Sequence, residues 1–204
     1  MASYEPLNPG DKVSARWAYE ELRRIAAVLD ELEAADTTIE AAVDALETLV
    51  PPIVWIPAQS FVAVLGTPVI GTAGGGRRHV FLFDAAASET IETNLAIPIG
   101  WSSFSTVIYW VNAGAGAGSV TWNLQGIHLA EGSSINAADN INNAVDFTEA
   151  AGAQDVIVET PCGNFTGLTA GRYLSLRVGR DGPTAADTLG NDAGFLGVKL
   201  TKSN

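Results

Sequence analysis

Apolar residues between positions 22 and 50 recur at alternating steps of three and four residues, and this spacing constrains the fold more than any other feature of the chain. The series contains one aspartate and keeps its phase throughout; its members are Leu22, Ile25, Leu29, Leu32, Asp36, Ile39, Val43, Leu46 and Val50. A repeat of 3.5 residues is typical of α-helices that supercoil around one another. The spacing predicts a coiled-coil helix over residues 14–50 that ends before Pro51.

The residue types at the heptad positions favour three strands. The a positions hold two leucines, two valines and Asp36, and the d positions hold two isoleucines and two leucines. Apolar or small residues also fill the g positions, so the stripe is wider than a dimer needs. We therefore expect a homotrimer, with a dimer left open. Asp36 is predicted to set the register, or to bind water or an ion on the three-fold axis, at a cost in stability.

Two other arrangements of this helix are compatible with the sequence. Its apolar face could pack on the globular part of its own chain. Alternatively, the helix could break into a hairpin near residues 36–38, where Thr37 and Glu40 have the spacing of a capping box. The heptad phase passes through this point without a slip, which favours one continuous helix.

Pro51 and Pro52 separate two segments of different character. Residues 1–50 hold one glycine and carry a net charge of −7, whereas residues 51–204 hold 20 glycines and carry a net charge of −5. We accordingly divide the chain into an N-terminal segment (1–13), a coiled-coil stalk (14–50) and a globular domain (51–204).

The globular segment has the pattern of an all-β protein. Its clearest apolar runs are Phe61–Leu65, His79–Phe83, Thr106–Val111, Val120–Leu129, Val156–Glu159, Tyr173–Val178 and Phe195–Leu200, and weaker runs lie at Val54–Ile56, Val69–Ile70 and Ile91–Ile97. Such strands without a long helix between them predict an antiparallel jelly-roll-like β-sandwich, and an α+β class for the whole chain. Residues 133–152 lack this alternation, so a short helix is an open alternative there. Residues 114–118 are expected to form a hairpin connection.

Aromatic residues lie in or beside the expected strands. Core packing is the expected role for most of Trp55, Trp101, Tyr109, Trp110 and Trp122. Two or more of them exposed at one place would instead indicate a platform on which sugar rings stack. The run 107–111 is apolar at every position, which predicts a strand covered on both faces, by the other sheet and by a neighbouring subunit.

Charge and composition argue against several classes of function. A net charge of −12 is unfavourable for binding nucleic acid or an anionic membrane surface, and no apolar stretch reaches the length of a membrane helix. The single cysteine, Cys162, excludes an internal disulfide and a cysteine-rich zinc site. Because no catalytic motif is present, we expect a non-enzyme without catalytic, cofactor-binding or metal-binding residues and without a cofactor.

Two acidic segments contain residue types that bind calcium but lack the spacing of a calcium loop. They consist of Asp139, Asn140, Asn142, Asn143 and Asp146, and of Asp181, Asp187 and Asp192. Solvated turns are the expected state, with a bound ion left open. His79 and His128 are far apart in sequence and are expected to be structural or surface residues.

A series of short motifs spans nearly all of residues 53–201. In order, they are Trp55-Ile56-Pro57-Ala58, Phe83-Asp84, Pro98 with Trp101, Tyr109-Trp110, Val120-Thr121-Trp122 with Gly126, Arg180-Asp181, Asp187-Thr188-Leu189 and Leu196-Gly197-Val198-Lys199-Leu200. In this order they resemble a domain of virion structural proteins of tailed bacteriophages, which occurs in fibre, spike and head-fibre proteins. The resemblance implies a trimeric virion component with a jelly-roll-like knob and no catalytic residues.

The start of the chain is also similar to the N-termini of such fibres. The matching residues are Gly10, Asp11, Val13, Ala15, Trp17 and Leu22, although Ala18 stands where the pattern commonly has asparagine. The resemblance implies that residues 1–13, with Pro9, Gly10, Asp11, Val13 and Trp17, anchor the protein to other virion proteins.

The resemblance and the helix together give the expected function. The chain is expected to be a homotrimeric fibre or spike of a tailed bacteriophage, made in the host cytoplasm without a signal peptide and located in the virion. Its knob would bind a glycan or protein on the host surface. The alternatives are a capsid-decoration, head-fibre or neck protein that binds no receptor, and a polysaccharide-degrading fibre tip.

Overall fold

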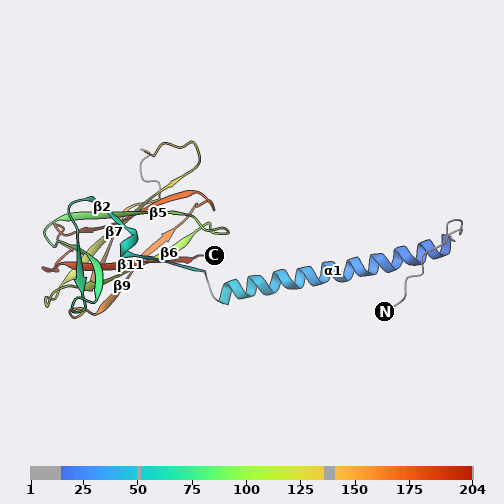
Figure 1. The fold of residues 1–204 in the computed structure, drawn as a ribbon, viewed down its shortest axis with the longest axis horizontal. Helices are drawn as coiled ribbons and strands as arrows, with labels where there is room; N and C mark the ends of the chain where they lie inside the picture. The colour runs from blue at the N-terminus through green and yellow to red at the C-terminus, as the bar shows by residue number, and fades with distance from the viewer. Residues whose placement is uncertain (1–14, 50–51, 136–140, 204) are drawn as a thin grey trace. The chain divides into compact units, whose positions relative to one another are not determined.

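The computed structural model describes residues 15–49, 52–135 and 141–203, and Figure 1 shows them as one long helix and a two-layered sandwich. The chain divides into two compact units, Met1–Val50 and Pro51–Asn204. The helix and the antiparallel jelly-roll-like sandwich are both present, so these parts of the expected fold are confirmed. The structure contains a single copy of the helix, and the trimeric coiled coil stays a prediction.

Helix α1 (Ala15–Leu49) is one uninterrupted element of 35 residues, and there is no hairpin near residue 36. The Thr37 hydroxyl donates to the Glu33 carbonyl at 2.9 Å, and the Thr38 hydroxyl donates to the Ala34 carbonyl at 2.8 Å. Both threonines therefore bond back to the preceding turn of the same helix and do not cap a new one. At about 1.5 Å per residue, the helix is roughly 52 Å long. No helix among the described residues has the length and apolarity needed to cross a membrane.

The sandwich consists of two antiparallel sheets. The first has the order β3-β4-β11-β6-β9 with β1 beside β11, and the second has the order β2-β5-β10-β7-β8. The strands are β1 (Ile53–Pro57), β2 (Val62–Leu65), β3 (Val69–Ala73), β4 (Arg78–Phe83), β5 (Ser88–Ala96), β6 (Phe104–Asn112), β7 (Ser119–Leu129), β8 (Ile141–Ala150), β9 (Ile157–Phe165), β10 (Tyr173–Asp181) and β11 (Ala193–Lys202), and a short 3-10 helix, η1 (Ala58–Ser60), follows β1. Figure 1 shows β2, β5 and β7 in one layer and β6, β9 and β11 in the other.

Two local expectations are wrong. Residues 141–150 lie in the segment for which the sequence allowed a short helix, but they form the edge strand β8. This strand pairs antiparallel with β7, and Ser119 stands opposite Ala150 at one end of the pairing. Its sequence contains the β-branched residues Ile141, Val145 and Thr148, but Asn142, Asn143 and Ala144 interrupt the alternation that signals a strand, and pairing with β7 forms the strand nonetheless. Residues 114–118 are not a hairpin connection, because β6 and β7 belong to different sheets and this segment crosses from one to the other.

Aromatic side chains fill the space between the sheets. The ring of Trp122 contacts Phe83 and Trp110 edge to face, at centroid distances of 5.4 and 5.8 Å, and Phe61 contacts Phe195 in the same way at 5.1 Å. The indole N–H of Trp110 donates to the Thr160 hydroxyl at 2.9 Å, so this buried polar atom is satisfied.

A buried arginine fixes the loop before β11. The Arg180 guanidinium pairs with both oxygens of Asp187, at 2.9 Å from Nε and 2.8 Å from Nη2. Its remaining three donors reach the carbonyls of Phe83, Asn191 and Leu189 at 2.6–2.9 Å. All five donors of a guanidinium are therefore used, which is the condition under which a buried charge is tolerated.

Candidate functional site

Trp55 lies on the outer face of the first sheet, near the middle of β1. Strand β1 pairs antiparallel with β11, and Trp55 stands directly opposite Lys199. Side-chain alternation along the strand sends Ile56 into the core and leaves Trp55 48% exposed. Because Trp101, Trp110 and Trp122 are at most 4% exposed, Trp55 is the exception among the tryptophans whose side chains the structure describes.

Tyr109 on β6 packs against Trp55. The two ring centroids are 5.1 Å apart and the ring planes meet at 83°, an edge-to-face arrangement that aromatic quadrupoles favour. Between their strands, β11 carries Gly197 opposite Tyr109. A Cβ at Gly197 would lie 2.7 Å from Cζ2 of Trp55 and 2.5 Å from the Ile56 carbonyl, so the absence of a side chain there makes room for the indole ring.

Lys199 adds a cation to this pair. Its ammonium lies 5.4 Å from the centroid of the Tyr109 ring, within the range of a cation–π interaction. A hydrogen bond with Tyr109 raises the pKa of Lys199, burial opposes that rise, and the charge of Glu159 reinforces it. Glu159 stands opposite Tyr109 on β9, so the outer face carries a row of aromatic and charged side chains across four strands.

A hollow of about 400 Å³ lies beside this row. Its wall is formed partly by apolar and aromatic side chains and partly by polar ones: Trp55, Gln59, Arg77, Arg78, His79, Tyr109, Ile157 and Leu196. A small number of polar groups around an apolar surface is the usual composition of a site for a small ligand. We refer to this hollow and the Trp55–Lys199–Tyr109 cluster as the Trp55 site.

The two arginines of the Trp55 site follow a glycine turn between β3 and β4. Gly74, Gly75 and Gly76 all have positive φ, between 63° and 84°, a conformation that other residues rarely adopt. The turn is held by the Arg77 amide, which donates to the Ala73 carbonyl at 3.2 Å, and by the Gly74 amide, which donates to Oδ1 of Asp155 at 2.9 Å. The glycines thus bring two cationic side chains to the edge of the hollow.

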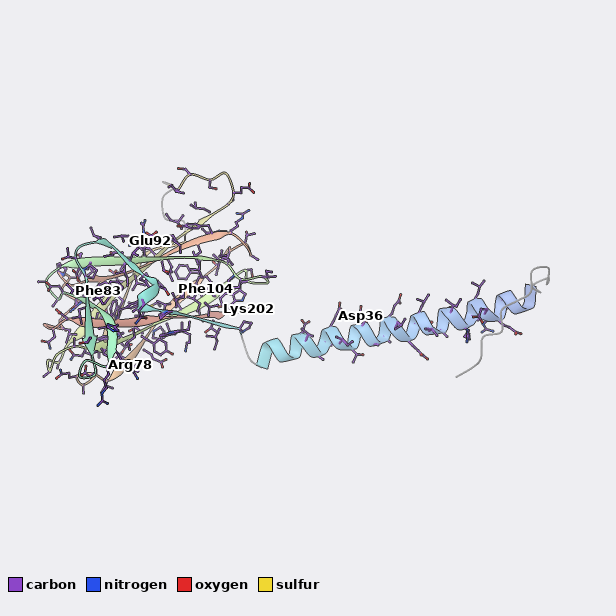
Figure 2. All side chains as sticks on the ribbon, in the orientation of Figure 1. Asp36, Arg78, Phe83, Glu92, Phe104 and Lys202 are labelled. Atoms are coloured by element: carbon purple, nitrogen blue, oxygen red, sulfur yellow. The ribbon has the colours of Figure 1, made fainter. Side chains whose placement is uncertain are left out.

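The outer face of the second sheet differs from this arrangement. Its polar side chains pair with one another: the Tyr173 hydroxyl donates to Oδ1 of Asn94 at 2.6 Å, and Arg177 pairs with Glu92 at 2.7 Å. Figure 2 shows Glu92 and Arg78 on opposite sides of the sandwich. Tyr173 is 43% exposed but has no second aromatic ring beside it among the described residues.

Several residues considered from sequence are structural. Cys162 is fully buried, and burial raises the pKa of its thiol to about 12. Burial and the charge of Arg172 lower the pKa of His128, whose Nε2 accepts the Thr169 amide at 3.3 Å. Asp187 is committed to Arg180. No group of three or more potential metal ligands occurs in the part of the chain that the structure describes; Asp139 and Asn140 lie outside it.

The residues predicted to mediate oligomerisation form an exposed stripe where their side chains are described. Leu22, Ile25, Leu29, Leu32, Ile39 and Val43 are between 48% and 65% exposed, and Asp36 is exposed with them. The Leu46 side chain and Val50 lie outside the described residues. The predicted anchoring residues Pro9, Gly10, Asp11 and Val13, and the side chain of Trp17, also lie outside them.

The sequence identified Trp55 and Tyr109 as candidates but did not distinguish them from the core tryptophans. The hollow, Lys199, Arg77 and Arg78 were not predicted. The pairing of β1 with β11 brings together residues about 140 positions apart, which no local pattern reveals. The one local signal was the adjacent pair of arginines after three glycines, in a domain with only seven basic residues.

Comparison with known proteins gives only distant structural likenesses. No family model matches the chain. No curated protein matches it in sequence.

Several of the similar solved structures are carbohydrate-binding modules. One is the CBM36-1 domain of a multidomain xylanase from the hindgut metagenome of Trinervitermes trinervoides, with 8% identity, a TM-score of 0.46 and coverage of 75% of this chain and 99% of that one. Another is a family 35 carbohydrate-binding module from Clostridium thermocellum, with 16% identity, a TM-score of 0.46 and coverage of 72% and 97%. The Cry4Aa toxin from Bacillus thuringiensis has 12% identity and a TM-score of 0.48 over 74% of this chain and 24% of that one. Likenesses this distant concern the type of β-sandwich and identify no site.

These comparisons contradict the interpretation of the chain as a tailed-bacteriophage fibre or spike. The similar structures named above include carbohydrate-binding modules and no virion protein. The expected localisation in a virion stays a prediction.

Proposed function

We propose that this chain is a non-catalytic carbohydrate-binding protein whose sandwich binds a glycan at the Trp55 site and whose helix assembles several copies. The observation that carries the proposal is the exposed Trp55–Tyr109 pair, with ring centroids 5.1 Å apart on one sheet face. Pyranose rings have apolar C–H faces that pack on aromatic rings, while their hydroxyl groups require hydrogen-bond partners at the rim.

The exposure of Trp55 supports this function, because an indole ring gains stability when it leaves water. Burying a large apolar side chain is worth about 1.5–3 kcal/mol, yet Trp55 remains 48% exposed. The absence of a side chain at Gly197 lets the ring lie close to the sheet surface, and the contact with Tyr109 limits its orientation without burying it. A rigid aromatic ring that is already in place loses little conformational entropy when a ligand stacks on it.

The rim of the hollow supplies the polar groups that a sugar requires. The amide of Gln59, the imidazole of His79 and the guanidinium groups of Arg77 and Arg78 all line it. Gln59 Nε2 donates to the His79 carbonyl at 3.4 Å, a long contact that leaves the amide able to accept a hydrogen bond from a hydroxyl group.

The helix is the proposed means of assembly into a homotrimer. Its apolar stripe keeps a 3.5-residue repeat without a break, and the described members of this stripe are at least 48% exposed. Sister copies of the same helix are the occupants that match this repeat. Three linked sandwiches would gain avidity for a polymer that repeats its binding unit.

The proposal is tested by measuring binding to immobilised polysaccharides and to soluble oligosaccharides with wild-type protein and the Trp55→Ala variant. We expect the variant to bind about ten to one hundred times more weakly, as the loss of roughly 1.5–3 kcal/mol implies, while the sandwich stays folded. Tyr173→Ala is the matched control, because it removes an exposed aromatic ring from the opposite sheet. Binding that is equally strong in Trp55→Ala, or a failure of the wild-type protein to bind any glycan in a broad panel, would contradict the proposal.

A further inference from the structure

The positive charges of the sandwich gather at the Trp55 site. Residues 51–204 contain seven basic and twelve acidic residues. Of the seven basic residues, Arg77 and Arg78 line the hollow, and Lys199 lies beside the same aromatic pair. Three of seven cations at one small site is an uneven distribution for a chain whose net charge is −12.

These arginines differ from two of the three other arginines of the domain, Arg177 and Arg180, in how their charge is used. Arg180 is buried with all five donors satisfied, and Arg177 pairs with Glu92 at 2.7 Å. Among the described residues, Arg77 and Arg78 form no ion pair; the one side-chain hydrogen bond of Arg78 goes to the Arg77 carbonyl at 3.0 Å. Figure 2 shows the Arg78 side chain extending from the surface of the sandwich. Both guanidinium groups are therefore free to bind an anion.

Two carboxylates lie near these cations and reduce their effect only partly. Glu159 acts on Lys199, and Asp155 accepts the Gly74 amide at the base of the arginine turn. The site still holds three cations against two carboxylates, whereas the rest of the domain holds four cations against ten carboxylates. At physiological ionic strength the Debye length is about 8 Å, so distant acidic residues are screened and the local cations dominate.

We infer that the Trp55 site recognises an acidic glycan, one whose sugar rings carry carboxylate or sulfate groups. This inference rests on the proposed function of the same site and specifies its ligand class. The Trp55–Tyr109 pair would hold the apolar face of a sugar ring, and the guanidinium groups would bind its anionic group through paired N–H donors. A neutral glycan could accept hydrogen bonds from Arg77 and Arg78 but would leave their positive charges without a counter-charge.

The test uses two pairs of oligosaccharides that differ in charge and share a backbone. One pair is hexagalacturonate and its methyl ester, and the other is κ-carrageenan hexasaccharide and its desulfated form. The full-length protein should bind the charged member of at least one pair about tenfold or more tightly than its neutral counterpart. The pair that responds identifies the anion as a carboxylate or a sulfate.

Variants then separate the two parts of the site. In the Arg77→Gln, Arg78→Gln double variant, the preference for the charged member should fall to about twofold or less, and in Trp55→Ala binding of the preferred glycan should fall about tenfold or more. The control is the Arg172→Gln, Lys202→Gln double variant, which changes the net charge equally at residues that do not line the hollow. This control should keep the preference.

Each other outcome overturns the inference in a different way. If a neutral member binds as tightly as its charged partner and Trp55→Ala abolishes binding, the ligand is a neutral glycan and the proposed function stands. If the control double variant loses the preference as fully as the arginine variant, net charge and not this site selects the ligand. If no charged or neutral oligosaccharide in the panel binds, the inference and the proposed function both fail.

Discussion

The helix and the sandwich contain the same kinds of apolar residue but treat them differently. Ile108, Leu124 and Leu174 in the sandwich are completely buried, whereas Leu22 and Leu32 in α1 are 65% and 59% exposed. The sandwich completes its core within one chain because two sheets supply facing surfaces. A single helix cannot bury its own stripe, so its stability depends on another surface. The comparison shows one unit whose core is complete within the chain and one whose apolar stripe is exposed; in the proposed trimer, contacts between chains would cover that stripe.

The aspartates of the two regions also differ in whether they are buried or exposed. Asp187 in the sandwich is almost fully buried and pairs with Arg180, while Asp36 on the helix is exposed in the middle of the apolar stripe. Figure 2 shows Asp36 on the helix, projecting from its surface. A buried carboxylate such as Asp187 requires a partner within the fold. A carboxylate at a heptad a position is solvated in the single helix, and it destabilises the structure only when helices assemble and remove it from water.

The largest expected effect comes from placing charge in the helical stripe. The Leu29→Asp, Leu32→Asp double variant should convert a trimer of about 64 kDa, three times the chain mass of 21.2 kDa, into monomers. Each leucine buried between helices contributes about 1.5–3 kcal/mol, and a trimer would lose six of them. Sedimentation equilibrium would measure the mass, and circular dichroism would detect the accompanying loss of helix.

The matched control adds the same charge to the opposite side of the helix. In the Ala27→Asp, Ala34→Asp variant both carboxylates occupy f positions, which point away from an assembled seam, so the mass should remain that of the wild type. The sandwich should melt at the same temperature in both variants. A wild-type protein that sediments as a monomer would contradict the proposal that the helix is stabilised by contacts between chains.

The second largest effect is expected in the sandwich. Arg180→Met would leave the Asp187 carboxylate unpaired and remove donors from three carbonyl groups. Breaking a buried ion pair in this way costs about 3–5 kcal/mol, which denaturant unfolding of the sandwich would measure. The mass of the oligomer should not change, because the helix is untouched.

A second variant tests whether the isolated carboxylate causes that loss. Arg180→Met combined with Asp187→Leu removes both charges and should recover part of the stability, although the carbonyl groups remain without donors. A loss below about 1 kcal/mol in Arg180→Met alone would mean that water satisfies the vacated groups.

The two regions also differ in how far the sequence predicts them. The helix was predictable over nearly its whole length, since its period and its proline stop are local properties. Most strands were predictable from alternation, but β8 was not, because Asn142, Asn143 and Ala144 have low strand propensity. The pairing with β7 is made by the residues on either side of them, Ile141 and Val145–Ala150. The Trp55 site depends on the register between β1 and β11, which is set by the fold and not by neighbouring residues.

A smaller effect is expected at Asp36. Asp36→Leu should raise the thermal stability of the assembled helix by about 1–3 kcal/mol per chain, because it replaces a polar residue at an a position with one that gains from burial. Thermal melting followed by circular dichroism would measure the shift. Asp30→Leu, at a b position, is the control and should leave the melting temperature nearly unchanged. A lower melting temperature in Asp36→Leu would show that the aspartate makes a favourable contact in the assembly.

The smallest effect is expected at Cys162, the only thiol of the chain. Its side chain is fully buried and its sulfur donates to the Thr160 carbonyl at 3.2 Å. Since burial raises the pKa of Cys162 to about 12, almost no thiolate is present at pH 8, and a disulfide reagent should not label the folded protein. The same reagent should label it rapidly in denaturant.

The raised pKa also links this thiol to folding. Below the unfolded thiol pKa of about 8.5, both states are protonated and burial of the neutral thiol favours the fold in full. Above that pH the unfolded chain releases its proton first, so this contribution should decline as the pH rises toward 12. The Cys162→Ala variant should lack this part of the pH dependence. Rapid labelling of the native protein at pH 8 would mean that the sandwich opens around β9. It would then contradict the distinction between a sandwich whose core is closed and a helix whose apolar stripe is exposed.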